Sequence, residues 1–398
     1  MQHDEIVVLG GARTPFGKFG GSFKDTSATD LGVAAAKGAL EASGVQPNQV
    51  QHVVFGNVIQ SSKDAAYLAR HVALHAGMPI EVPGLTLNRL CGSGFEAIVQ
   101  AARMIRCGEA EIVLAGGTEN MSMAPLVTRT ARWGAGLGEG LTLEDSLWQG
   151  LTDSYCNLPM AITAENVAQQ YSVSREEQDA LALASQRRAV AGWQEGRLPA
   201  EIVPTQGKDG RGRPLTVTQD EHIRPETTAE GLAKLPARFI PKGGTVTAGN
   251  ASGIVDGAAA LVIASGKAAA ALGLKPWARL AGYGIAGVPP EIMGMGPVPA
   301  NRIALEKAGL TVQDIGLWEI NEAFAAQCLA CAKELGFDLD LLNVNGGAIA
   351  IGHPLGATGA RVSLTLIKEM QRRGVRYGSA SMCIGGGMGA AGIFELMD

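Results

Sequence analysis

The sequence lacks the excess of positive charge that is typical of proteins binding nucleic acid or anionic membranes. Its 33 Lys and Arg face 38 Asp and Glu, which gives a net charge of -5 and a pI near 5.8. Non-specific binding to either partner needs a basic surface. We therefore expect no nucleic-acid partner and no membrane partner, and an anionic substrate would have to meet a local basic patch.

Long apolar runs and paired cysteines are also scarce. Glycine, proline or charge interrupts each apolar run before it reaches the length of a membrane-spanning helix. The six cysteines are not densely or regularly spaced, which favours free thiols in a reducing compartment. Residues 1–6 are polar and acidic, without the features of a secretory signal or an Arg-rich leader. We expect a cytoplasmic protein.

Glycine, in contrast, is abundant. The chain has 54 glycines in 398 residues, roughly twice the usual fraction. Tight turns and close approaches of backbone should therefore be frequent. The length exceeds that of a single core, so two or three domains are expected.

Short apolar runs alternate with amphipathic stretches in the first 120 residues. The expected strands cover residues 5–9, 53–55, 85–87 and 112–115, and the expected helices cover residues 31–42, 65–76 and 95–105. The glycine pairs at 10–11 and 116–117 should end the first and last of these strands. The alternation predicts an α/β fold with a layered and substantially parallel sheet.

The texture changes between residues 121 and 242, where charge and proline increase and strand signals become rare. Two helices are expected there, at 163–170 and 174–196. We interpret the region as an inserted loop domain. Ten Lys or Arg lie between residues 187 and 242, among them Arg211, Arg213 and Arg224. One hypothesis is that they all belong to a solvated surface; the other is that several of them contact phosphates of a substrate.

The strand and helix rhythm returns with a strand at 259–263 and continues to the C-terminus. The first half has a strand, a glycine-rich turn with Cys91, a helix and a second strand. The same order of elements is expected from residue 343 to Cys383, although the two sequences are not identical. We expect an N-terminal half of residues 1–120 with 243–270, the loop domain of 121–242, and a C-terminal half of 271–398.

Cys91 is the strongest candidate for a nucleophile. It precedes Gly92, Ser93 and Gly94 and the amphipathic helix of 95–105. A thiol at a helix N-terminus meets unpaired amides and the positive end of the dipole, which should favour the thiolate and stabilise an oxyanion. The alternative is a buried cysteine that only fills the core.

Three further residues have the chemistry to assist a thiol. His353 lies in a stiff Gly-His-Pro turn, and a histidine near its usual pKa exchanges protons readily; its alternative is a structural histidine. Cys383 ends a strand of small residues before Gly385, and could serve as an acid or base or simply pack in the core. Asn321 falls between a strand and a helix, where capping the helix would explain it equally well.

Two other patterns are misleading. Cys328 and Cys331 have CxxC spacing, but they lie in an expected helix at 323–335 without a second ligand pair, so core packing is favoured and no metal is expected. The glycines at 10–11 follow a strand, but residues 12–15 break the GxGxxG pattern, which argues against a dinucleotide site. Cys107 and Cys156 have no partner motif.

The motifs around Cys91, Asn321, His353 and Cys383, taken together and in this order, closely resemble the thiolase family, which makes and breaks 3-ketoacyl-CoA. The resemblance covers essentially the whole chain. It implies a five-layered αβαβα sandwich of two similar halves, and an acetyl-CoA C-acyltransferase that condenses acetyl-CoA with acetyl- or acyl-CoA and cleaves 3-ketoacyl-CoA, acetoacetyl-CoA included. CoA would be a substrate, with no separate cofactor.

The resemblance also implies roles for individual residues. Cys91 would carry the acyl group, His353 would activate it, and Cys383 would be the second acid or base. The amides of Gly385 and Cys91 would line an oxyanion hole, and Asn321 would hold a water near the enolate. The expected contacts to CoA and its tunnel are Leu147, Met160, Arg224, Phe239, Ala248, Ser252, Ala323 and Phe324.

Some features remain open at this stage. Thiolases specialised for acetoacetyl-CoA often carry His-Met before a Thr-Ala-Glu-Asn stretch, whereas this chain has Leu158 and Pro159 before Met160. The pattern is closer to the fatty-acid-oxidation type and leaves the preferred chain length undecided. We expect a homodimer or homotetramer. Rival hypotheses are a condensing enzyme of the ketoacyl synthase type and a non-catalytic acyl-CoA carrier of the same fold.

Overall fold

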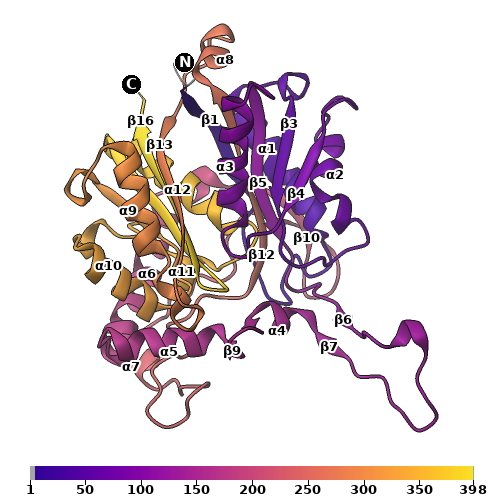
Figure 1. The fold of residues 1–398 in the computed structure, drawn as a ribbon, viewed down its shortest axis with the longest axis vertical. Helices are drawn as coiled ribbons and strands as arrows, with labels where there is room; N and C mark the ends of the chain where they lie inside the picture. The colour runs from indigo at the N-terminus through magenta and orange to yellow at the C-terminus, as the bar shows by residue number, and fades with distance from the viewer. Residues whose placement is uncertain (1–4, 398) are drawn as a thin grey trace.

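The computed structural model describes residues 5–397. Residues 1–4, on which the expected absence of a leader partly depends, lie outside the described range. The chain forms two α/β halves that face each other across a central pair of helices (Figure 1). No helix among residues 5–397 combines the length and apolar character needed to cross a membrane.

The N-terminal half contains a five-stranded sheet with two helices on its outer face. Val7, Leu9, Val53 and Phe55 point from the sheet toward these helices and are buried with them. The outer helices are α1 (Ala28–Ser43), which Ser27 caps and Gly44 ends, and α2 (Leu68–His75). The strands, in spatial order, are β1 (Ile6–Arg13), β12 (Val255–Ser265), β5 (Ile112–Glu119), β3 (His52–Gly56) and β4 (Gly84–Leu87), and β2 (Gly17–Lys18) pairs with β12.

The C-terminal half repeats this plan with four strands. Its outer face packs against α9 (Pro297–Ala308) and α10 (Ala325–Leu335). The strands, in spatial order, are β13 (Ala278–Gly287), β16 (Met388–Leu396), β15 (Tyr377–Ile384) and β14 (Leu317–Ile320). A short antiparallel pairing of Val7 and Val8 in β1 with β13 joins the two half-sheets.

The inner faces of both half-sheets pack against α3 (Ser93–Arg106) and α12 (Thr358–Arg373), which also contact each other. Phe95 and Ile98 of α3 and Leu366 and Met370 of α12 belong to one buried apolar cluster with residues of both sheets. The order of layers is therefore helix, sheet, helix, sheet, helix. The expected five-layered sandwich is confirmed.

The expectation of a substantially parallel sheet is wrong. Among the strands of residues 5–397, only β3 with β4, β3 with β5, and β14 with β15 pair in parallel. β12 enters the sheet after the inserted region and runs antiparallel to both β1 and β5. β16 follows β15 through a tight turn at residues 385–387, and this hairpin makes the pair antiparallel.

The two glycine pairs do not end strands, as the sequence pattern predicted, but lie inside them. β1 continues through Gly10 and Gly11 to Arg13, and β5 continues through Gly116 and Gly117 to Glu119. A Cβ on Gly10 would lie 2.5 Å from Ser43 N of α1, and one on Gly117 would lie 1.8 Å from Gly356 O. These glycines are required because other backbone packs directly on the strands.

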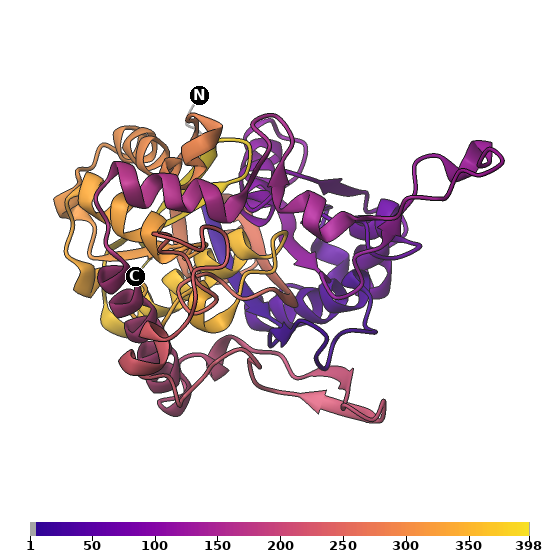
Figure 2. The same cartoon turned by 90° about the horizontal axis from the view of Figure 1, so that it is seen from below.

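The region of residues 121–242 covers one end of the sandwich and sends out two projections (Figure 2). One projection is an arm between β6 and β7, and the other is the hairpin of β10 and β11. The capping box of Ser174 and Glu177 fixes the start of its longest helix. Its elements are β6 (Leu126–Val127), β7 (Glu144–Asp145), α4 (Ser146–Gly150), β8 (Thr152–Asp153), β9 (Leu158–Pro159), α5 (Met160–Gln170), α6 (Arg175–Gln194), β10 (Thr205–Lys208), β11 (Pro214–Val217) and α7 (Ala229–Ala233).

Two short helices complete the described chain. α8 (Gly266–Ala271) follows β12, and α11 (Ala348–Ile351) precedes the His353 turn. Residues 343–345, which correspond to a strand in the internal repeat, form none; only Leu342 makes an isolated bridge to Trp318. The second half therefore reaches its central helix through a loop rather than through a strand.

Candidate active site

Cys91 lies in the turn between β4 and α3. Leu90 has a φ of 46°, and the Ser93 hydroxyl donates to Leu90 O and accepts from Arg89 N, so the turn is tied to the start of the helix. A Cβ on Gly92 would lie 2.4 Å from Ile384 Cδ1 of β15. Glycine at this position therefore allows the Cys91 turn of one half to approach the Cys383 strand of the other.

The Cys91 thiol is partly exposed, and its surroundings disfavour ionisation. Burial raises the pKa of the thiol to about 11, and the charge of Glu119 also raises it. The backbone N–H groups of Gly385 and of Cys91 itself act in the opposite direction. The expectation that the helix start would favour the thiolate is wrong for the resting site. Desolvation of the anion outweighs the two amides.

His353 is held as a neutral imidazole with one nitrogen available. Its Nδ1 lies 2.6 Å from Thr358 Oγ1, and that hydroxyl donates to Pro354 O at 3.0 Å. Because the hydroxyl hydrogen is used for Pro354, Oγ1 accepts from Nδ1–H, which leaves Nε2 with its lone pair. Burial lowers the pKa of His353 to about 3, and the charge of Arg361 lowers it further.

Cys383 occupies the end of β15 and is completely buried. Burial raises the pKa of its thiol well above the usual value, and the charges of Cys91 and then Cys331 raise it further. Cys383 packs with Met293 and Ala323. Its sulfur is therefore electrostatically coupled to that of Cys91, although the two residues come from different halves.

Asn321 connects β14 with α10 but does not cap the helix. The N-cap residue is Phe324, and the Asn321 backbone pairs instead with Ser381 O of β15 at 2.9 Å. Its Nδ2 lies 3.5 Å from His353 Nε2. Among residues 5–397, no group donates to its buried Oδ1. The capping alternative is wrong, and the amide side chain faces the histidine.

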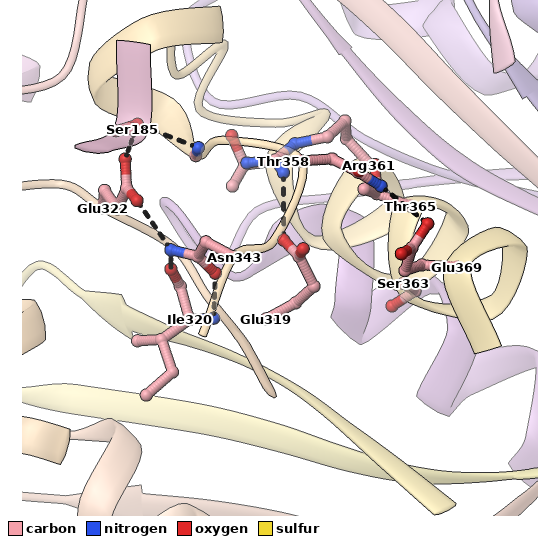
Figure 3. Close-up of polar contacts among 12 residues, drawn as sticks. Ser185, Glu319, Ile320, Glu322, Asn343, Thr358, Arg361, Ser363, Thr365 and Glu369 are labelled. Carbon is pink, nitrogen blue, oxygen red and sulfur yellow. Dashed lines mark hydrogen bonds and ion pairs between the residues drawn. The ribbon is translucent and has the colours of Figure 1, made fainter. Parts of the chain in front are cut away.

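A network of buried polar groups fixes the chain on both sides of this amide (Figure 3). Glu322 accepts from Ser185 Oγ at 2.6 Å, from Asn343 Nδ2 at 2.8 Å and from Ile349 N at 3.1 Å. Asn343 Oδ1 in turn accepts from Ile320 N at 2.9 Å. The network ties the Asn321 segment to the loop that leads to His353, which explains why both side chains keep their relative positions.

A pocket with a volume of about 160 Å³ opens beside His353. Four of the residues expected at the CoA tunnel line it: Met160, Phe239, Ser252 and Phe324. Cys91 and Cys383 do not line this pocket, but it borders both of their clusters: Met160 and Phe324 pack on the Cys383 cluster, and Leu355 belongs to the apolar cluster against which Cys91 packs.

The other expected contact residues lie around this pocket rather than in its lining. Leu147 packs in the Cys91 cluster, and Ala323 packs with Cys383. Ala248 is exposed in the loop that precedes Ser252. Arg224 lies apart, beside Arg187 in a surface pocket of about 160 Å³. Arg213, another member of the basic stretch, pairs with Asp209 in the β10 and β11 hairpin.

Sequence reasoning missed Thr358, Glu119 and Trp148. Thr358 lies five residues after His353, but only the helix start brings its hydroxyl to the ring. Glu119 ends an apolar strand two residues after Gly117, and an isolated acid at a strand end was a usable signal. Trp148 lines the pocket from α4, where nothing in the sequence distinguishes it from other apolar residues.

The CxxC pair lies in the core of the C-terminal half. Cys328 and Cys331 are both buried on α10, and Cys331 Sγ lies 3.2 Å from Gly294 O. Burial raises the pKa of Cys331 to about 12, so its thiol stays neutral. These two cysteines pack as small apolar groups.

Comparison with known proteins gives full-length matches. Residues 6–267 match the model of the thiolase N-terminal domain, and residues 274–396 match that of the thiolase C-terminal domain. The mitochondrial 3-ketoacyl-CoA thiolase of Homo sapiens is 53% identical over 98% of both chains. The acetyl-CoA acetyltransferase of Syntrophomonas wolfei is 47% identical over 99% of both. A crystal structure of human mitochondrial 3-ketoacyl-CoA thiolase in complex with CoA superposes with a TM-score of 0.96, at 52% identity, and covers 99% of this chain and 98% of that chain.

These comparisons correct one expectation. The N-terminal residues and the cysteine usage predicted a cytoplasmic protein, but the relatives from Homo sapiens and Mus musculus, at 53% and 51% identity, are named as mitochondrial enzymes. The expectation of a cytoplasmic protein is therefore wrong, since these relatives are named for another compartment. Composition and cysteine spacing do not distinguish two reducing compartments.

Proposed function

Because the chain belongs to the thiolase family, we propose that its reaction runs through a thioester on Cys91. The protein is an acetyl-CoA C-acyltransferase, which condenses acetyl-CoA with an acyl-CoA and cleaves 3-ketoacyl-CoA with CoA. CoA is a substrate, and no separate cofactor is indicated. The assignments of individual residues and the finer properties below are inferences from the geometry of the site.

In the first step, the Cys91 sulfur attacks the carbonyl carbon of an acyl-CoA while its proton passes to His353 Nε2. The tetrahedral intermediate then collapses, the bond to the CoA sulfur breaks, and His353 returns the proton to CoA. Two observations support this order: the imidazole is neutral with Nε2 unprotonated, and the Gly385 N–H points at the Cys91 sulfur, near the developing oxyanion.

In the second step, neutral His353 takes the proton of the Cys383 thiol, and the resulting thiolate removes a proton from the α-carbon of acetyl-CoA. The new carbon–carbon bond forms as the bond from the acyl carbon to the Cys91 sulfur breaks, and the proton on His353 passes to that sulfur, so that both thiols end protonated. The unpaired Asn321 Oδ1 and the neighbouring His353 support an enolate site in which the amide holds a water. Thiolysis reverses these transfers, and metabolite levels set the direction.

Two observations support this mechanism most directly: the charge of Cys91 acts on the Cys383 thiol of the other half, and His353 lines a pocket that borders the apolar cluster of each cysteine. The test is rapid mixing of the enzyme with acetyl-CoA. The wild type should release a burst of CoA equal to the number of sites, and Cys91→Ala should release none. A full burst from Cys91→Ala would overturn the assignment of the nucleophile. A carrier protein without catalysis would show no burst in either form.

We propose that residues 121–242 form the domain that covers CoA, between an N-terminal half of 1–120 with 243–270 and a C-terminal half of 271–398. The pocket lining supports this division, since Met160 and Phe239 come from the loop domain and Ser252 follows it. Arg187 and Arg224 would meet the nucleotide. Replacing both with Gln should raise the KM for CoA and leave thiolysis of a pantetheine thioester unchanged; an unchanged KM would remove this contact.

We propose that the chain assembles into a homodimer or homotetramer through its projecting arm. The arm between β6 and β7 extends away from the sandwich (Figure 2), and its apolar side chains include Trp133 at 86% exposure and Leu137 fully exposed. A second copy of the chain is the partner that would cover them. Trp133→Ser with Leu137→Ser should lower the assembly state in sedimentation; an unchanged tetramer, or a monomeric wild type, would contradict the proposal.

We propose a degradative role in fatty acid β-oxidation. The run from Leu158 to Asn166 lacks the histidine that acetoacetyl-CoA thiolases often carry before Thr-Ala-Glu-Asn, and the Cys91 cluster is apolar. Thiolysis of a 3-ketoacyl-CoA series should therefore continue beyond acetoacetyl-CoA. Activity confined to acetoacetyl-CoA would favour the biosynthetic role instead.

A further inference from the structure

The buried carboxylate of Glu119 lies at the end of β5, where the two halves of the active site meet. It is completely buried and accepts four hydrogen bonds. Its Oε1 accepts from Asn57 Nδ2 at 3.1 Å and from Ile59 N at 3.0 Å. Its Oε2 accepts from Val58 N at 3.0 Å and from Gly356 N at 2.9 Å.

The donors belong to two loops that come together only in the folded protein. Residues 57–59 follow β3 in the N-terminal half, whereas Gly356 lies three residues after His353 in the C-terminal half. Gly356 packs closely on two glycines of the N-terminal half, because a Cβ on Gly94 would lie 2.8 Å from its oxygen, and one on Gly117 would lie 1.8 Å from it. Glu119 is therefore a polar link between the loop beside Cys91 and the turn that carries His353.

The same two loops form the surroundings of the nucleophile. Cys91 and Val58 both pack against an apolar cluster that contains Ile59 and Leu355. Val58 and Ile59 donate to Glu119 directly, and Leu355 is adjacent to Gly356. A shift of the carboxylate would therefore move the walls on both sides of the Cys91 sulfur.

The pattern of donors also fixes the charge of Glu119. Four N–H groups occupy its two oxygens, and a proton on either oxygen would face a donor rather than an acceptor. Burial raises the pKa of Glu119 to about 7, the N–H groups of Ile59, Val58 and Gly356 lower it, and the charge of Asp256 raises it. The carboxylate is therefore ionised at mildly alkaline pH and lies close enough to Cys91 to disfavour the thiolate.

We propose that Glu119 is a positioning residue with an added electrostatic function: its carboxylate holds the loops around Cys91 at their working separation, and its charge adds to the burial that keeps the sulfur protonated until His353 takes the proton. The other titratable groups around Cys91 are His353 and Cys383, and Asp256 faces Glu119 from β12. A thiol that ionises only during attack is protected from other electrophiles. The proposal rests on Cys91 being the nucleophile.

The test compares two rates in the full-length enzyme at pH 8 to 10: acetylation of Cys91 by acetyl-CoA, and alkylation of Cys91 by iodoacetamide, followed by mass spectrometry of its peptide. Glu119→Gln removes the charge and replaces one carboxylate oxygen with an NH₂ group. The hydrogens of this NH₂ group would face the two N–H groups that the oxygen accepted from. Acetylation should fall about 100-fold because the geometry is disturbed, and alkylation should become about tenfold faster because the thiolate is less disfavoured.

Glu119→Asp separates the two effects, because it keeps the charge but shortens the reach. Its acetylation should fall, whereas its alkylation should stay at the wild-type rate. Glu395→Gln is the matched control, since it removes the charge of a largely buried carboxylate of β16 that binds Arg376 and Tyr377 rather than the active-site loops, and it should change neither rate.

Unchanged acetylation in Glu119→Gln would overturn the proposal. Equal acceleration of alkylation in both Glu119 variants would also overturn it, because exposure rather than charge would then control the thiol. If Glu119→Gln does not fold, unchanged acetylation in Glu119→Asp is the contrary result. Failure of the Cys91 mechanism itself would be recognised separately, by a full CoA burst from Cys91→Ala.

Discussion

Cys91 and Cys383 come from opposite halves of the molecule and have contrasting surroundings. Cys91 lies in a turn at a helix start, is partly exposed, and receives the Gly385 N–H. Cys383 lies within a strand and is completely buried among Met293 and Ala323. Burial raises the pKa of both thiols. The difference supports the proposal that the Cys91 sulfur meets an incoming thioester, whereas Cys383 would act only on a group that has already entered the site.

The largest effect that would sharpen this comparison is expected from Cys383→Ala. Cys91 should still accept an acetyl group at a normal rate, but condensation and thiolysis should fall about 10³-fold or more because the proton transfer at the α-carbon is lost. Stopped-flow measurement of CoA release, beside steady-state turnover, checks both halves of the reaction. Equal losses in acetylation and turnover would mean that the two cysteines share one role.

The next effect concerns the tautomer of His353. Thr358→Val should lower kcat about 10- to 100-fold, because the Nδ1–H loses its acceptor and the lone pair no longer stays on Nε2. Thr358→Ser should restore most of the rate. Ser363→Ala is the matched control, because that hydroxyl bonds Gly359 O of the same helix and does not contact the histidine. A similar loss in the control would show that the hydroxyl matters only for the helix.

The pH dependence of Cys91 should be simple and lack a neutral plateau. Since its thiol has a pKa raised to about 11, alkylation should rise about tenfold per pH unit from pH 8 to 10, where Glu119, with a pKa of about 7, is already ionised. Since the pKa of His353 is lowered to about 3, the imidazole is neutral across this range and should add no inflection. A plateau near pH 7 would reveal a thiolate–imidazolium pair and would remove the contrast between the resting thiol and the reacting thiolate.

The smallest effect is expected from the remaining buried thiols. Cys328→Ala should lower stability by roughly 1 kcal/mol by leaving a small cavity and should leave acetylation and turnover unchanged, because Cys328 lies in the apolar core of the C-terminal half. Thermal unfolding and steady-state kinetics measure the two quantities. A loss of turnover without a loss of stability would give this cysteine a part in the chemistry.

The catalytic candidates could be recognised from sequence because each lies in a local motif of small residues, and the order of strands and helices followed from apolar periodicity. The direction of the strands could not be recognised, because β12 enters the sheet only after the long insertion. The glycines of β1 and β5 were predicted to end these strands. They lie inside the strands because backbone from distant segments packs on them, and the local sequence does not show that packing. Glu119 and Thr358 gain their roles only from partners that folding supplies.

The protonation state of Cys91 shows the same limit. A cysteine at a helix start usually indicates a lowered pKa, but here desolvation and the charge of Glu119 act in the opposite direction. Neither is visible in the residues that flank Cys91. The chemistry of the site was therefore predictable by residue type, whereas its electrostatics required the contacts between the halves.

One measurement tests the central claim most directly: mixing Cys383→Ala with acetyl-CoA, quenching in acid, and mapping the acetyl group by peptide mass spectrometry. The account predicts one acetyl group per chain, on the peptide that contains Cys91, and no further reaction when more acetyl-CoA is added. An unmodified Cys91, or an acetyl group on any other residue, would contradict it.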